Sequence, residues 1–110
     1  MTGPVQVELL TVPDCPGGVP TEQLLHELAF ELQIELQLQR TVVSNQQQAD
    51  QANFPGSPTV RIAGTDPVDT DAPASLACRL YRTEAGLRPI PDRATLHAAL
   101  QAAVEDRGAS

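Results

Sequence analysis

The chain has 110 residues, a length that suits one domain with one hydrophobic core. Its formal net charge of −7 argues against the basic surface that nucleic acids and anionic membranes require, so neither is expected as a partner. No apolar run approaches the roughly 20 residues of a membrane span, and the N-terminal MTGPVQ lacks a signal-peptide pattern. Two cysteines, Cys15 and Cys78, are too few for a disulfide scaffold, so we expect a cytoplasmic protein with reduced thiols.

The first part of the chain is expected to alternate strands and helices. Residues 5–12, VQVELLTV, are almost continuously apolar after Glu8, which is typical of a central strand. Residues 20–31 carry leucines at helical spacing and predict a helix. Apolar and polar residues then alternate strictly, which predicts a second strand at about 33–43. Ser44 followed by Gln47 is a capping-box pattern, so a short helix is expected over 45–52.

The second part contains shorter elements. Residues 59–64, TVRIAG, predict a third strand, and 65–77 form an acidic, proline-containing loop. Residues 78–82, CRLYR, predict a further short strand, which TEAG turns, and the last helix is expected over about 92–105 with Asp92 as its cap. This order predicts an α/β fold. We expect a mixed sheet with helices on both faces and parallel first and second strands.

Two short motifs resemble those of the thioredoxin-like superfamily. CPGG at 15–18 follows the first strand and precedes the first long helix, where that family has its C-x-x-C motif. GSPTV at 56–60 matches the family's cis-proline segment. The resemblance implies a single thioredoxin-like domain over 1–110, with a mixed sheet of about four strands flanked by three helices. It also implies a cis Ser57–Pro58 bond beside Cys15.

The chain departs from the family at Gly18, where the family has its second active-site cysteine. The dithiol pair is therefore lost, which puts ordinary disulfide reductase activity in doubt. The whole chain also resembles small bacterial thioredoxin-like proteins, some of which carry an alkylmercury lyase label.

The position of Cys15 favours a reactive thiol. A helix N-terminus stabilises negative charge, so this thiol is expected to be more acidic and more exposed than a core cysteine. Gly17 and Gly18 would let the backbone approach a bound sulfur or anion closely. Asp14 would oppose the thiolate if it lies close, although a solvated turn aspartate is the simpler interpretation. The alternative for Cys15 is a small apolar residue buried in a turn.

Three residues of the second motif and the second cysteine complete the candidate site. A cis Pro58 would leave the backbone groups on either side of it, at Ser57 and near Thr59, free to hold an extended substrate segment. Cys78 is either a resolving thiol for Cys15 or a core cysteine on a strand. If CRLYR is the fourth strand of the sheet, Cys78 lies at the end away from Cys15. If the 65–77 loop returns the chain, the pair becomes possible.

The remaining polar residues predict no metal or cofactor site. His26 and His97 are lone helix histidines without metal-ligand spacing. DPVDTD at 66–71 lacks the glycine and the terminal glutamate of a calcium loop, so a solvated acidic loop is expected. Arg79 and Arg82 are expected to flank a strand and pair with surface carboxylates.

Three functions follow from these observations. The first is a thiol-dependent redox protein, in which Cys15 attacks a protein or small-molecule disulfide and Cys78 or an external thiol resolves the intermediate. The second is a non-catalytic thioredoxin-like binding module that holds a partner at the GSPT edge. The third is organomercurial or metal-thiol chemistry with both cysteines. No pattern in the sequence indicates an oligomeric state.

Overall fold

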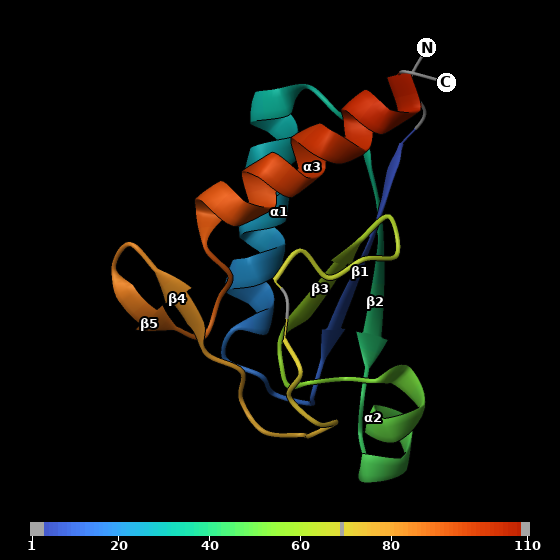
Figure 1. Cartoon of the computed structure of the whole chain (residues 1–110), viewed down its shortest axis with the longest axis vertical. Coiled ribbons are helices and arrows are strands. Elements are labelled where there is room, and N and C mark those ends of the chain that lie inside the picture. The colour runs from blue at the N-terminus through green and yellow to red at the C-terminus, as the bar shows by residue number, and fades with distance from the viewer. Residues whose placement is uncertain (1–3, 69, 109–110) are drawn as a thin grey trace.

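The computed structural model describes residues 4–68 and 70–108. Residues 1–3, part of the segment judged for a signal peptide, and Asp69 of the acidic loop lie outside the described residues. Strands and helices follow one another along the chain as shown in Figure 1. In order they are β1 (Val5–Thr11), α1 (Gly18–Leu32), β2 (Leu36–Val42), α2 (Gln46–Ala52), β3 (Thr59–Ile62), β4 (Tyr81–Thr83), β5 (Gly86–Arg88) and α3 (Arg93–Gly108). Among the described residues, no helix has the length and apolar character needed to cross a membrane.

The main sheet contains three strands in the order β2-β1-β3. β1 pairs with β2 in parallel, as predicted for two strands joined by a helical crossover, and with β3 in antiparallel orientation. The prediction of a mixed α/β fold is therefore confirmed. The prediction of a fourth strand in this sheet is wrong, because β4 pairs with β5 in a separate two-stranded sheet.

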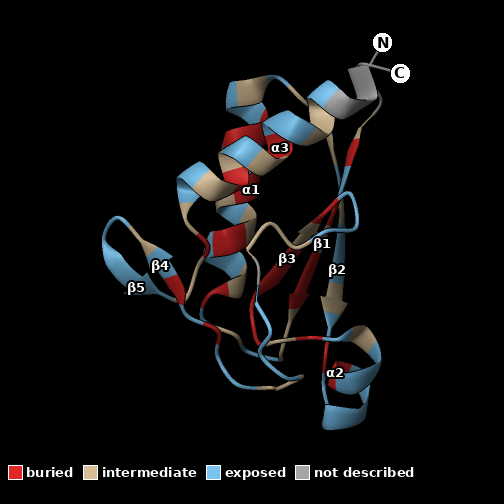
Figure 2. Ribbon diagram, in the orientation of Figure 1, coloured by how far each residue is buried: buried red, intermediate tan, exposed pale blue. Residues whose placement is uncertain are grey.

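The hydrophobic core lies on one face of the main sheet. Alternate residues of β1 point toward both long helices, which pack on each other as well as on the sheet. The buried residues of this core are Val5, Val7, Leu9, Leu25, Leu28, Val60, Ile62, Leu96 and Leu100. The expectation of helices on both faces is met only by α2, which covers one end of the other face through Leu10, Val43, Ala49 and Phe54. Figure 2 shows buried residues concentrated on α1, β1 and β3.

The end of α1, the start of β2 and the cap of α2 differ from the prediction. α1 continues to Leu32, and Gln33 ends it with a left-handed φ of 55°. The first residues of the alternating pattern therefore belong to the helix and its C-cap, since Leu32 satisfies both periods. The short helix is capped by Asn45, whose side chain accepts a hydrogen bond from the Gln48 N–H, rather than by Ser44.

Candidate functional site

Cys15 lies in the turn that joins the end of β1 to the start of α1. Its side chain is half-buried and its thiol is free. The Cys15 carbonyl accepts a hydrogen bond from the Gly18 N–H at 3.2 Å, which closes the turn. Asp14 is exposed and has a φ of 58°, a left-handed conformation that aspartate tolerates better than most residues. The sequence therefore presents the thiol at the start of the helix, as expected.

Gly17 and Gly18 have different structural roles. Gly17 is buried, and a Cβ atom there would lie 2.2 Å from the Pro89 carbonyl oxygen and 3.1 Å from Cδ of Pro58. Only glycine fits this close approach, which brings the turn directly against Pro58. The predicted cis Ser57–Pro58 bond is present. A Cβ at Gly18 would instead meet only ordinary contacts, with Cys15 Cβ at 4.0 Å.

The first turn of α1 offers few free N–H groups. Gly18 donates to Cys15, Thr21 donates to the Gly17 carbonyl, and Pro20 has no N–H. Of these first residues of α1, only Val19 keeps an N–H group without a partner among the described residues, so the turn does not present a full set of donors.

The backbone edge expected to be free for a substrate is occupied by the chain itself. The Ser57 N–H donates to the Ala77 carbonyl at 3.0 Å, and the Ser57 carbonyl accepts from the Arg79 N–H at 2.8 Å. Ser57 and Thr59 are fully buried, and the Ser57 hydroxyl accepts a hydrogen bond from the Val12 N–H. An extended partner can pair with Ser57 only if residues 77–79 move away.

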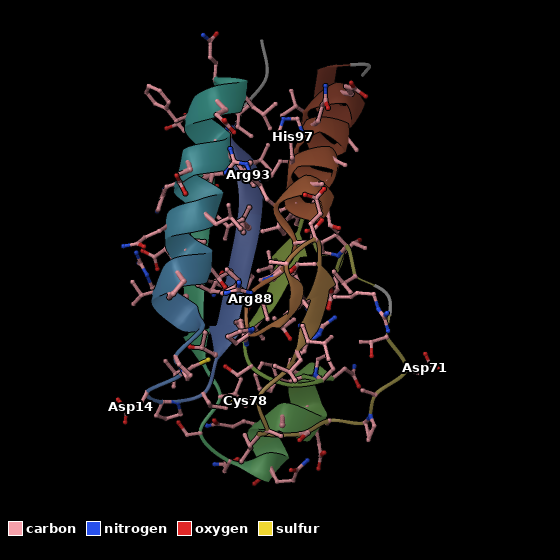
Figure 3. All side chains as sticks on the ribbon, turned by 90° about the vertical axis from the view of Figure 1, so that its left-hand side faces the viewer. Asp14, Asp71, Cys78, Arg88, Arg93 and His97 are labelled. Atoms are coloured by element: carbon pink, nitrogen blue, oxygen red, sulfur yellow. The ribbon has the colours of Figure 1, made fainter. Side chains whose placement is uncertain are left out.

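The loop over 65–77 returns the chain to the end of the sheet where Cys15 lies. Cys78 forms a parallel bridge with Ser57, next to the proline that contacts Gly17. Figure 3 shows Cys78 and Asp14 toward the same end of the molecule. Cys78 is exposed and its thiol is free. CRLYR is therefore not the fourth strand of the main sheet, and Cys78 does not lie at the far end.

A buried polar cluster holds this returning segment in place. The Arg79 guanidinium donates to Asp66 at 2.7 Å, to the Thr59 hydroxyl at 3.1 Å and to the Val68 carbonyl at 3.0 Å. Its Cζ atom also lies 4.6 Å from the centre of the Tyr81 ring. Arg79 thus pairs with a carboxylate as predicted, but in a buried position, and Asp66 is not simply solvated.

Tyr81 is a site residue that sequence reasoning missed. Its hydroxyl donates a hydrogen bond to the Pro58 carbonyl, and its ring is buried. Burial raises the pKa of Tyr81 well above its ordinary value, and the nearby charge of Asp66 acts in the same direction against the opposing effect of Arg79. The hydroxyl therefore stays protonated beneath the proline. The available signal was the single tyrosine of the chain, placed three residues after Cys78.

The described residues contain no group of three or more histidine, cysteine, aspartate or glutamate side chains arranged to hold a metal ion. His26 lies 3.9 Å from Glu22 on the surface of α1. No protein-family model matches the chain, and comparisons with curated proteins and with solved structures likewise find no match.

Proposed function

We propose that this chain is a thioredoxin-like, cytoplasmic redox protein that uses Cys15 as the nucleophile of thiol–disulfide exchange. One observation carries the proposal. The half-buried Cys15 thiol sits in a turn that packs through Gly17 directly on Pro58, and the second cysteine of the chain reaches the same end of the molecule. A cysteine that served only to fill the core would need neither an accessible turn nor a second cysteine at the same end of the molecule.

The thioredoxin-like part of the proposal rests on three features. β1 leads into CPGG and α1, β2 is parallel to β1, and β3 begins directly after the Ser57–Pro58 segment. The part of the chain that the structure describes has no fourth strand in the main sheet, so the proposed relationship concerns the first three strands and the two motifs.

The reaction proceeds in two exchange steps. The Cys15 thiolate attacks one sulfur of a disulfide, forms a mixed disulfide with it and releases the other sulfur as a thiolate. The Cys78 thiolate, or an external thiol, then attacks the Cys15 sulfur and releases the second substrate thiol. With Cys78, two electrons pass from the protein dithiol to the substrate, and an external dithiol must later reduce the Cys15–Cys78 disulfide.

The surroundings of the thiol favour a protein disulfide as the substrate. The exposed residues nearest to the two cysteines in sequence are mostly uncharged: Pro16 follows Cys15, and the 58% exposed Leu80 follows Cys78 by two positions. Residues 77–79 already form hydrogen bonds with the backbone of Ser57. The substrate therefore contacts the side chains around the two cysteines and does not add a strand at Ser57.

The test is the reaction of the reduced protein with hydroxyethyl disulfide, followed by intact mass. The wild-type protein should end with a loss of two mass units, and Cys78→Ser should stop at one mercaptoethanol adduct on Cys15. Cys15→Ser should react at least about tenfold more slowly, as an ordinary exposed thiol does. Equal rates for the two single variants would refute Cys15 as the nucleophile and favour the binding-module interpretation.

A further inference from the structure

The outer edge of β2 has unpaired backbone groups. The Val5 N–H donates to the Glu35 carbonyl and the Val43 N–H donates to the Thr11 carbonyl, so odd-numbered residues of this region bond toward β1. Because bonding direction alternates along a strand, the N–H and carbonyl groups of Leu36, Leu38, Arg40 and Val42 point away from the sheet. Among the described residues, none of these groups has a hydrogen-bond partner.

The two edge strands of the main sheet, β3 and β2, differ in how their outer backbone groups are protected. On the β3 side, the N–H and carbonyl of Ile62 both bond to Thr65. The β2 margin has no proline and no bulge, which are the usual means of protecting an edge strand. Its one charge, Arg40, is held by Glu22 of α1 at 2.5 Å. Figure 2 shows β2 as the strand of the main sheet with the least burial.

α1, which the Glu22–Arg40 ion pair joins to β2, carries exposed apolar residues. Val19 is 67% exposed and Phe30 is 86% exposed. Both lie on the outer side of the helix, between Glu22, which bonds to β2, and Glu31, which pairs with Arg93 of α3. The Glu22–Arg40 ion pair joins this helix to the free strand edge.

We propose that this surface binds a second copy of the chain, with the two β2 strands paired in antiparallel orientation about a two-fold axis at Gln39. This register makes Gln39 face its own copy, and an amide suits that place because it both donates and accepts hydrogen bonds. Leu36 then lies opposite Val42 of the second copy, whose side chain is 56% exposed in one chain alone.

The helices support the same axis. The midpoint between Val19 and Phe30 falls less than one turn from Glu22, the residue that contacts Arg40 beside Gln39. A two-fold axis at Gln39 therefore places Phe30 of one copy near Val19 of the other, with the two α1 helices antiparallel. The strand edge is compatible with this axis and the two exposed helix residues favour it, and neither observation depends on the proposed thiol chemistry.

Symmetric cross-linking tests the register. In a Cys15→Ser, Cys78→Ser background, Gln39→Cys should form an intermolecular disulfide readily, because facing residues that are not hydrogen-bonded lie about 4.5 Å apart between Cα atoms. The matched control is Gln37→Cys, on the same exposed face, whose two copies would lie about 13 Å apart. We expect cross-linking at least about tenfold faster for Gln39→Cys. Equal rates at the two positions would overturn the register.

Sedimentation of the full chain tests the surface itself. The wild-type protein should show a concentration-dependent dimer, and Phe30→Ser should raise the dissociation constant by about tenfold or more, because two copies of the ring leave the interface. Leu87→Ser, which removes an apolar side chain that is 64% exposed on β5, should leave it unchanged. A protein that stays monomeric at all concentrations, or equal effects of the two variants, would overturn the proposal.

Discussion

Replacing Gly18 by cysteine should create a disulfide with Cys15. A Cβ atom at position 18 would lie 4.0 Å from the Cys15 Cβ, inside the range of about 3.5–4.5 Å that disulfides adopt. Its closest other neighbour, Cγ2 of Thr11, is at 3.4 Å, so the side chain fits without displacing the backbone. The residue is the first of α1 and has no positive φ, so an L-residue adopts its conformation readily.

The size of the effect follows from the loop that the bond closes. Cross-linking a loop of about four residues removes chain entropy worth about 2 kcal/mol from the unfolded state. For a domain of this length, that corresponds to a rise in melting temperature of about 8 °C. The gain should disappear when a reductant is added, since the reduced variant lacks the cross-link.

Intact mass and thermal unfolding, each with and without dithiothreitol, measure both effects. Gly17→Cys is the matched control, because its Cβ would meet the Pro89 carbonyl oxygen at 2.2 Å and should cost about 2–3 kcal/mol. A Gly18→Cys protein that stays fully reduced in air, or that is no more stable when oxidised, would refute the geometry assigned to this turn.

Three further predictions concern the framework around the site. Ala63 has a left-handed φ of 51° in an exposed turn, so Ala63→Asn should stabilise the protein by about 0.5–1 kcal/mol in denaturant unfolding, and a loss of stability would contradict the turn. Arg79→Met should destabilise it by about 2–4 kcal/mol by leaving Asp66 unpaired, while the exposed Arg82→Met stays within about 0.5 kcal/mol; similar losses would contradict the buried cluster. Because burial raises the pKa of Tyr81, the folded chain keeps this proton where the unfolded chain loses it, so stability should be intact below about pH 10 and fall above it. Absorbance at about 295 nm follows this single tyrosine, and normal ionisation in the folded protein would contradict its burial.

The sequence predicted those parts of the fold that local periodicity determines. The apolar run of β1 and the leucine spacing of α1 are strong local patterns, and their order determines the parallel pairing of β1 with β2. The start of β2 was misplaced because Leu32 fits a helical and an alternating pattern equally well. The fourth strand was misassigned because a strand's partner depends on the path of the whole loop before it.

The candidate site was partly predictable from the two short motifs. Gly17, two residues after Cys15, lies against Pro58, and this close approach explains why glycine stands there. The position of Cys78 required the structure, because the 65–77 loop allowed either end of the sheet. The cluster around Tyr81 joins residues from three separate segments, so no spacing in the sequence marks it.

The rate of alkylation of Cys15 by iodoacetamide at about pH 6.5 tests the central claim most directly. The Cys78→Ser variant isolates this thiol, and the same variant unfolded in urea provides the reference rate. Half-burial alone slows alkylation, so a faster reaction in the folded protein can only reflect an activated thiol. The proposed function predicts a folded rate at least about tenfold above the unfolded rate. A folded rate equal to or below the unfolded rate would contradict it.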